Sequence, residues 1–365
     1  MVPVARRNLF AEKGRFAISV GGVTFAVLLI LVILGLYRGF EREAGSVVES
    51  VPADIWVMEQ DTTDIFHSFS VISDENVSAV RAVPGVDGVI AVYARRAEAA
   101  YAGGSADSYL LALDLPEGTE ALPGIQAPRE GEIVIDEVFA RKTGLRVGDT
   151  VAIRERDLTI IRVADISNIG LSQFSLISAT DARDVIAIPG SVNFVLASVV
   201  PRIDPGAVAQ VIEESVTGVR AETKADFAED NRNEIMTFFL PIVSVLLVIA
   251  FLVGIVVIGL TIYTSTIERA REFAVMKAVG AGPVFLYRVV FSQSIILGVS
   301  GFLLGLPLAL AVNRVAENVV PEFVNILRWQ DLAAVFLVTL VMTIIAGLVP
   351  VRRVNSIDPA SVFRA

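Results

Sequence analysis

Residues Leu240–Tyr263, LPIVSVLLVIAFLVGIVVIGLTIY, form an apolar run without a charged side chain, and the charged segment IERAREFAVMKAVGA (Ile267–Ala281) follows it. At about 1.5 Å per residue, a helix over such a run spans the roughly 30 Å hydrocarbon core of a membrane. The whole chain agrees with this reading, because 54% of its 365 residues are apolar, 19% are charged and its mean hydropathy is +0.66. The sequence therefore indicates a membrane protein.

Three further apolar runs have the same character: Ala17–Tyr37, Phe285–Val312 and Leu332–Pro350. We expect an α-helical membrane protein with four transmembrane helices, and Pro241 suits the first turn of the second. A cleaved signal peptide is the alternative for the first run. That run is longer than the 7–15 apolar residues of a signal peptide and no small-residue cleavage site follows it, so we expect a retained anchor.

Basic residues give the expected orientation. Both termini and the connection between the second and third runs carry most of the basic residues near the spans, whereas the connection from Asn313 to Asp331 holds Arg314 and Arg328. The basic residues in question are Arg6, Arg7, Lys13, Arg15, Arg269, Arg271, Lys277, Arg352, Arg353 and Arg364. Because loops rich in Lys and Arg stay inside, both termini are expected in the cytoplasm.

The long segment between the first two runs, residues 41–233, is then extracytoplasmic. It holds 16 Lys and Arg against 32 Asp and Glu, so it offers no basic surface for nucleic acid. The chain has no cysteine, which excludes disulfides and cysteine-based metal or redox chemistry.

We expect this segment to fold as an α+β domain. Residues 53–93 predict a strand, a helix and a strand, and residues 193–223 repeat that order, which is typical of a split layer built from both ends of the segment. The residues between them, Tyr101–Ser191, predict a second, more β-rich subdomain.

Three segments remain for the cytoplasm. Residues 1–16 predict an amphipathic helix on the membrane surface, or a simple basic flank. Residues 264–284 hold a short helix that stops at Gly280, Gly282 and Pro283, and its many apolar positions fit either the membrane interface or a groove on a partner. Residues 351–365 form the C-terminal tail.

Motifs of catalysis are absent from the sequence. There is no nucleotide-binding G-x-x-x-x-G-K-[ST] motif, so ATP, if used, binds to another subunit. We assign no catalytic or metal-binding residue. The single histidine, His67, lies without neighbouring ligands and is treated as a loop or surface residue.

Two groups of residues near or within the spans have a candidate role. Ser294 and Gly298, then Gly301 and Gly305, recur four residues apart and predict close helix packing, within one chain or between two. Acidic, sulfur-containing and aromatic residues precede the second span and could line an opening for an amphipathic substrate or form an ordinary interfacial belt; they are Glu234, Met236, Phe238 and Phe239.

The segment E-R-x-R-E-F-A-V-M-K-A-V-G-A resembles the cytoplasmic segment of the MacB/FtsX superfamily of ABC transporter permeases. PVRRVNSIDPASVFR (Pro350–Arg364) is similar to the closing motif of that family, P-x-x-R-x-x-x-x-x-P-x-x-x-[LF]-R. The layout of one span, a large external domain and three more spans extends the resemblance over the whole chain. Ala274 departs from it, since many relatives have glycine there.

The resemblance implies a non-enzymatic permease in the bacterial cytoplasmic (inner) membrane. It implies a homodimer that binds two ATPase subunits, which hold ATP and Mg, and in some relatives a membrane-fusion adaptor. The segment that contacts the ATPase would comprise Glu268, Arg269, Arg271, Glu272, Phe273, Met276 and Lys277. Export of a drug, a lipid or heme is the implied function.

Chain length is nearest to the DevC-like and HrtB-like permeases, and by likeness to the latter Glu234 and Met236 are candidates to face heme. The alternative is an FtsX-like signal transducer that controls a cell-wall hydrolase.

Overall fold

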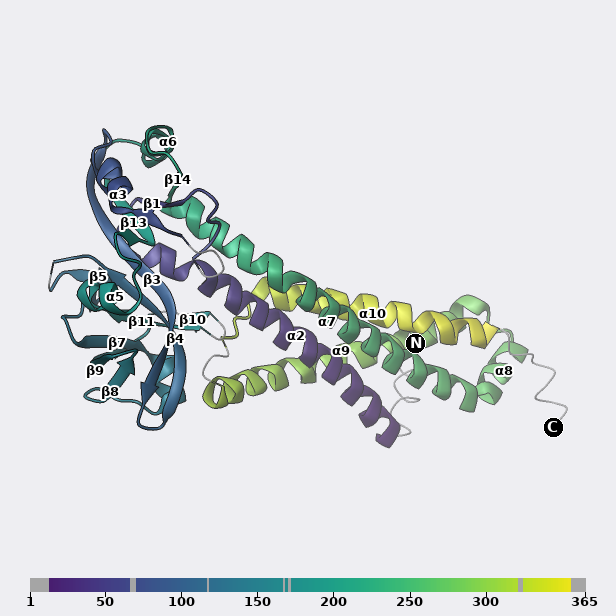
Figure 1. The fold of residues 1–365 in the computed structure, drawn as a ribbon. Coiled ribbons are helices and arrows are strands. Elements are labelled where there is room, and N and C mark those ends of the chain that lie inside the picture. Colours follow the sequence, from purple (N-terminus) through teal and green to yellow (C-terminus); the bar gives the residue numbers. More distant parts are fainter. Residues whose placement is uncertain are drawn as a thin grey trace. The chain divides into compact units, whose positions relative to one another are not determined.

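The computed structural model describes residues 13–65, 70–116, 118–166, 168–169, 172–320 and 324–355. The chain divides into two compact units (Figure 1). One, called the helical unit, holds the chain up to Arg38, Phe239–Val319 and the chain from Val324. The other, called the inserted domain, is essentially Gly39–Phe238. The expected N-terminal amphipathic helix, His67 and most of the C-terminal motif fall largely or wholly outside the described residues.

Within the described part of the chain, four helices are long and apolar enough to cross a membrane. They are α2 (Lys13–Ser50), α7 (Lys224–Glu268), α9 (Pro283–Val319) and α10 (Trp329–Asn355). Each contains one of the predicted apolar runs. The predicted fold class, four spanning helices with an α+β domain after the first, is confirmed.

The second spanning helix begins earlier than the sequence indicated. Pro241 lies inside α7 and not in its first turn, because the helix already begins at Lys224. The residues before Pro241 are held in the inserted domain: Phe227 and Ala228 are buried in its core, and the Asn231 side-chain amide donates to the Ala44 carbonyl of α2. This packing maintains a helix across a proline that removes one hydrogen bond.

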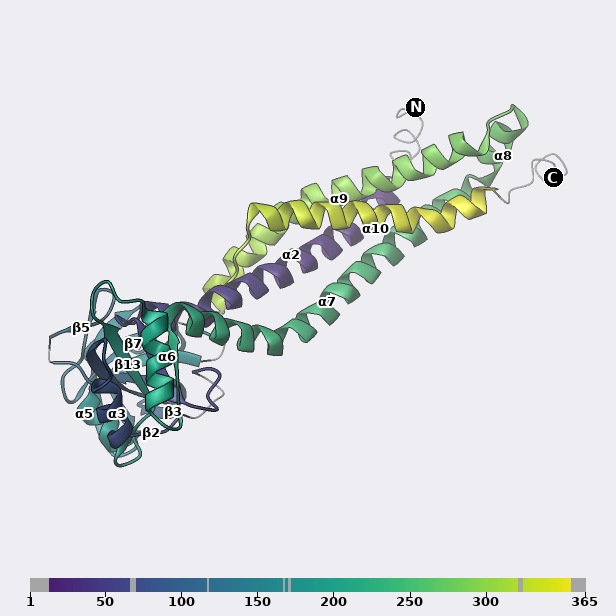
Figure 2. The same ribbon diagram turned by 90° about the horizontal axis from the view of Figure 1, so that it is seen from above.

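Close contacts between small and branched side chains hold the helical unit together. A Cβ added to Gly22 of α2 would lie 2.3 Å from Val257 Cγ1 of α7, and one added to Gly254 of α7 would lie 2.2 Å from Met342 Sδ of α10. Figure 2 shows α9 and α10 side by side, and they pack along each other. Small residues thus allow the helix backbones to approach closely, as membrane helices do.

The inserted domain combines short helices with a large mixed sheet. Its helices are α3 (Asp74–Arg81), α4 (Glu137–Thr143), α5 (Ala179–Val185) and α6 (Pro205–Ser215). Its strands are β1 (Ile55–Glu59), β2 (Ile72–Ser73), β3 (Val86–Tyr101), β4 (Gly104–Leu113), β5 (Glu120–Leu122), β6 (Ile125–Gln126), β7 (Glu132–Asp136), β8 (Thr150–Ile153), β9 (Arg156–Ala164), β10 (Asn168–Ile169), β11 (Ser172–Ile177), β12 (Ser191–Val192), β13 (Phe194–Val199) and β14 (Val219–Thr223).

Both ends of the inserted domain meet in one sheet, as the sequence indicated. The strand order β14, β1, β13, β3 brings strands from the start and the end of the domain side by side, all antiparallel. Helices α3 and α6 pack against this part of the sheet.

The β-rich subdomain is a closed barrel that shares β3 with this layer. Its strands follow one another in the order β3, β4, β11, β7, β9 and β8, and β8 returns to β3 through Ala99 and Ala100. It is therefore continuous with the first layer and is not a separate body.

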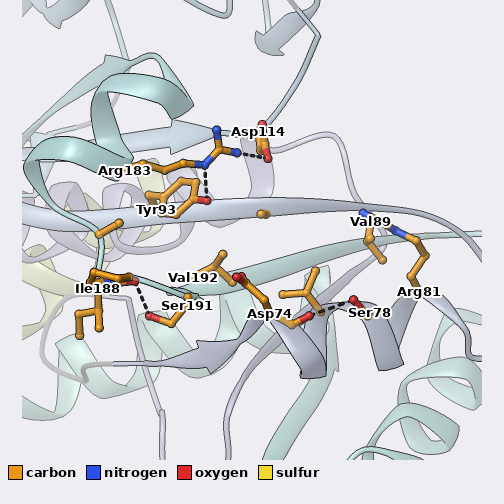
Figure 3. Close-up of a pocket in the computed structure, with 15 residues that line it drawn as sticks. Asp74, Ser78, Arg81, Val89, Tyr93, Asp114, Arg183, Ile188, Ser191 and Val192 are labelled. Carbon is orange, nitrogen blue, oxygen red and sulfur yellow. Dashed lines mark hydrogen bonds and ion pairs between the residues drawn. The ribbon is translucent and has the colours of Figure 1, made fainter.

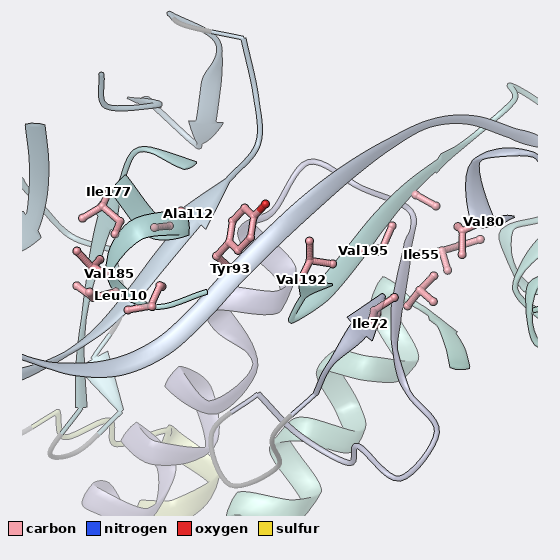
Figure 4. Packing of buried hydrophobic residues seen from close by; sticks show 14 of the residues in the cluster. Ile55, Ile72, Val80, Tyr93, Leu110, Ala112, Ile177, Val185, Val192 and Val195 are labelled. Carbon is pink, nitrogen blue, oxygen red and sulfur yellow. The ribbon is translucent and has the colours of Figure 1, made fainter. Parts of the chain in front are cut away.

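One hydrophobic core runs along β3 from the barrel to α3. Figure 4 shows Leu110, Ala112 and Val185 near the barrel and Ile55 and Val80 at the other end, with Tyr93 and Val192 between them. A continuous core makes β3 the strand that ties the two layers together.

Candidate functional site

The charged segment after α7 folds as the predicted short helix. Helix α8 spans Ala270–Ala278. It ends in a Schellman motif, in which the Ala281 amide donates to the Met276 carbonyl (2.9 Å) and the Gly280 amide to the Lys277 carbonyl (3.0 Å). Gly280 has φ of 100°, a left-handed conformation that suits glycine, and α9 starts at Pro283.

Helix α8 has a buried face and an exposed face. Phe273 and Ala274 are 2% and 0% exposed and lie on the buried face, Phe273 within the helical unit's core. Arg271 is exposed, and Val275 and Val279 are 45% and 84% exposed. Residues 271, 275 and 279 recur every fourth position, so they form one stripe of the helix, here called the α8 stripe.

The structure buries one predicted docking residue, Phe273, and exposes two apolar residues that the prediction did not include, Val275 and Val279. Phe273 holds α8 against its own chain and is not available to a partner. The exposed face of α8 could not be identified from the sequence, because apolar residues lie all around the helix. The exposed face of α8 carries an apolar pair with a cation beside it.

The other predicted docking residues surround the stripe. Glu268 and Glu272 are exposed, whereas Met276 and Lys277 are half-buried. The side chain of Arg269 is 13% exposed, and its Nη1 lies 3.7 Å from Glu272 Oε2. Arg269 therefore pairs with Glu272 within the same chain. The exposed acids, Glu268 and Glu272, lie beside the α8 stripe.

The small-residue positions of α9 pack within the chain. A Cβ on Gly301 would lie 2.4 Å from Val23 Cγ1 of α2, one on Gly305 2.9 Å from Val27 Cγ1, and one on Gly298 2.1 Å from Thr343 Cγ2 of α10. Ser294 is fully buried and its Oγ faces Gly347 of α10. These contacts pack α9 against α2 and α10 of the same chain.

The residues predicted to line a substrate opening lie on α7 but not on one face. Glu234 and Phe238, one turn apart, are both exposed. Met236 is 8% exposed and Phe239 is half-buried. Glu234 and Phe238 therefore lie together on the exposed face of α7, whereas the Met236 side chain is buried.

A part-buried polar cluster, which the sequence does not reveal, links α2 to the chain between α9 and α10. The Asn325 side-chain amide donates to the Val32 carbonyl (3.1 Å), and Asn325 Oδ1 accepts from Asn313 Nδ2 (2.8 Å). The Ile326 amide donates to the Gly35 carbonyl (3.0 Å). A Cβ on Gly35 would lie 2.6 Å from Asn325 Cγ, so glycine leaves the space that Asn325 fills.

One turn further along α2, an ion pair reinforces this cluster. Arg38 Nη2 lies 3.2 Å from Asp331 Oδ1, and the Asp331 side chain is 6% exposed. The other carboxylate oxygen of Asp331 accepts from the Arg328 amide (3.2 Å). Polar groups so buried are costly unless bonded, so these bonds fix the α9–α10 connection on α2.

The inserted domain carries a cleft of about 550 Å³ (Figure 3). Val89, Ala91 and Tyr93 of β3 line it, with α3 and α5 on either side. Arg183 Nε donates to the Tyr93 hydroxyl (3.0 Å), which raises the pKa of the guanidinium, and Arg183 Nη2 lies 2.5 Å from Asp114 Oδ2. The volume is that of a typical ligand pocket.

Among the residues that the structure describes, no three His, Asp or Glu side chains are arranged to hold a metal ion.

Comparison with known proteins agrees with this arrangement. A model of the MacB-like periplasmic core domain matches residues 16–215, and a model of the FtsX-like permease C-terminal region matches residues 244–359. An uncharacterized ABC transporter permease of Mycobacterium tuberculosis strain H37Rv is 23% identical over 364 residues, covering 100% of this chain and 99% of the relative. One from Methanocaldococcus jannaschii is 22% identical over 399 residues, covering 100% and 97%.

Two solved structures are also similar. The periplasmic region of MacB from Actinobacillus actinomycetemcomitans is 10% identical with a TM-score of 0.35, over 49% of this chain and 92% of that one. The extracellular domain of the transporter YknZ from Gram-positive bacteria is 14% identical with a TM-score of 0.32, over 47% and 98%. Because the MacB-like model alone covers more than half of the sequence, the chain belongs to the MacB/FtsX family of ABC transporter permeases.

Proposed function

We propose that this permease is the membrane subunit of an ATP-driven exporter that expels an amphipathic or hydrophobic compound, such as a drug, a lipid or heme. The observation that carries the proposal is the α8 stripe. Arg271, Val275 and Val279 face outward on a helix whose other face is anchored in the helical unit. A helix with exposed apolar residues and a firm base is suited to docking in a groove of a partner.

An ABC transporter permease acts with an ATPase, and the sequence has no motif with which to bind nucleotide itself. In the proposed assembly, two copies of the permease bind two ATPase subunits, which hold ATP and Mg. The complex lies in the bacterial inner membrane with both termini cytoplasmic, as the distribution of Lys and Arg supports. A membrane-fusion adaptor on the outer side is compatible with the large inserted domain.

The route of the substrate is proposed to pass the outer end of α7. Glu234 and Phe238 share an exposed face there and combine a carboxylate with an aromatic ring. Such a pair suits an amphipathic compound with a cationic or hydrogen-bonding end. Met236 is buried, so heme, if it is the cargo, meets Glu234 and Phe238 first.

The proposal is tested by reconstitution. The permease is co-expressed with an ABC ATPase from the same organism, the complex is placed in proteoliposomes, and ATP hydrolysis is measured with a macrolide, a phospholipid analogue and heme. We expect hydrolysis to depend on the permease and to rise with at least one of these compounds. Hydrolysis that none of them stimulates, together with binding of a cell-wall hydrolase to the inserted domain, contradicts export and supports signalling.

A further inference from the structure

The strand that floors the cleft has an open edge. β13 pairs with Val86–Val92 of β3, whereas β4 pairs only with Val92–Tyr101 on the opposite edge. The last bond on that second edge runs from the Asp114 amide to the Ala91 carbonyl (2.8 Å). Before Ala91, no described strand lies beside this edge of β3.

The direction of the backbone groups follows from the register. The Ala197 carbonyl of β13 accepts from the Asp54 amide next to β1, so the main-chain N–H and C=O of Ala197 point away from β3. Val89 is the partner of Ala197, so its own N–H and C=O point away from β13. Ala91 agrees, since its carbonyl points to the β4 edge. Val89, two residues earlier, therefore presents its N–H and C=O on the open edge.

The cleft beside this edge holds two charges that no described residue neutralises. Asp74 and Arg81 stand at the two ends of α3, both exposed, and neither side chain has an ion pair or hydrogen bond among the described residues. The other two charges, Arg183 and Asp114, bind each other. Figure 3 shows Val89 near Arg81 and Val192 near Asp74, so apolar surface lies between the two free charges.

We propose that the cleft binds an extended segment of a partner protein, which adds as a strand to the open edge of β3 at Val89. The main chain of the segment bonds to the N–H and C=O of Val89. Its side chains on one face follow the pattern basic, any residue, apolar, any residue, acidic. The basic residue meets Asp74, the apolar residue rests on Val89 and Ala91, and the acidic residue meets Arg81.

Distances agree with this ligand. Asp74 and Arg81 lie about 10 Å apart along α3 at 1.5 Å per residue. Residues four apart in a strand are separated by about 13 Å and point to the same face, a difference that the long Arg81 side chain covers. A rigid small molecule would fill the apolar floor but would leave the main-chain groups of Val89 without partners, so an extended peptide suits the site better.

A peptide selection tests the proposal on the full chain in nanodiscs. A random decapeptide library on phage is selected against the protein, with empty nanodiscs as the background, and one enriched peptide is synthesised with a fluorescent label. We expect enriched peptides to carry the alternating pattern. We expect Val89→Pro, which removes an N–H that the native sheet does not use, to weaken binding at least tenfold, while Val89→Ala keeps it within about threefold.

A charge exchange tests the orientation. Arg81→Glu is expected to weaken the peptide at least tenfold, and a peptide with its acidic residue changed to Lys is expected to bind Arg81→Glu better than the original does. In a Trp329→Phe background, unchanged Trp56 fluorescence shows that the variants are folded, since Trp56 is fully buried in this domain. No enrichment over empty nanodiscs, or binding that Val89→Pro leaves unchanged, overturns the proposal. Sensitivity to Arg81→Glu alone indicates a charged ligand that is not a strand, and also overturns it.

Discussion

Gly301 shows how a single missing side chain sets the distance between two helices. A Cβ there would meet both the Val23 side chain at 2.4 Å and the Thr24 backbone nitrogen at 3.2 Å, and the backbone cannot rotate away. We expect Gly301→Val to destabilise the helical unit by about 1–3 kcal/mol, the usual cost of overpacking. Gly21→Val is the matched control, because nothing lies within 4 Å of a Cβ at that exposed position of α2. Equal thermal midpoints for the two variants, by circular dichroism in one detergent, would contradict the packing.

Asp136 connects a buried carboxyl to the pH dependence of stability. It caps α4 by accepting from the Val138 amide (2.7 Å) and also accepts from the Ile166 amide (3.1 Å), and burial raises its pKa from 3.8 to about 6. Between about pH 4 and pH 6 the folded state holds a proton that the unfolded state has lost. Stability due to this group therefore falls as pH rises through that window, by roughly 2–3 kcal/mol.

Asp136→Asn cannot titrate, so the stability of the wild type relative to this variant should fall from pH 4 to pH 6 and then level off. Trp56 fluorescence in a Trp329→Phe background reports unfolding of the inserted domain alone, since these are the two tryptophans of the chain. If the stabilities of the two proteins changed in parallel with pH, burial would not raise the pKa of Asp136.

At the scale of elements, the contact between α2 and the α9–α10 connection is the feature most open to a direct test. A Cβ on Gly35 would lie 2.6 Å from Asn325 Cγ, which places the two Cβ atoms within about 4 Å, the spacing that a disulfide requires. The natural chain has no cysteine, so an engineered pair has no competitor. We expect Gly35→Cys with Asn325→Cys to cross-link under mild oxidation, seen as loss of maleimide labelling. Gly21→Cys with Asn325→Cys should remain reduced, and cross-linking in both pairs would argue against a specific contact.

Elements differ in how far their sequence determines them. The four spanning helices and α8 follow from local composition and from the stop at Gly280 and Pro283. The barrel does not, because β7 with β9 and β4 with β11 are parallel pairs whose register depends on residues far apart in the chain. The free face of α8 could not be predicted either, since Phe273 and Val275 are both apolar and only tertiary packing buries the first.

The open edge of β3 and the Asn325 cluster are two further features that could not be predicted from the sequence. An edge is a property of the neighbouring strands, and no residue of β3 marks it. Asn325 looks like an ordinary loop residue until Gly35 and Val32 of α2 are placed beside it.

At the scale of the whole molecule, the chain consists of two units. The helical unit anchors α8 and leaves the α8 stripe, the proposed contact with an ATPase, exposed. The inserted domain, which α2 enters and α7 leaves without a break in either helix, carries the cleft.

Co-purification of the ATPase with permease variants tests whether the ATPase binds the α8 stripe. Val275→Asp with Val279→Asp should reduce the bound ATPase at least tenfold and abolish permease-dependent ATP hydrolysis, because two charges replace the apolar contact. The thermal midpoint should not change, as both side chains are exposed. The control, Val147→Asp, makes one such substitution at a 61% exposed site in the inserted domain, and this variant should bind the ATPase normally. Full ATPase binding and hydrolysis in the double variant would contradict docking of the ATPase on the α8 stripe.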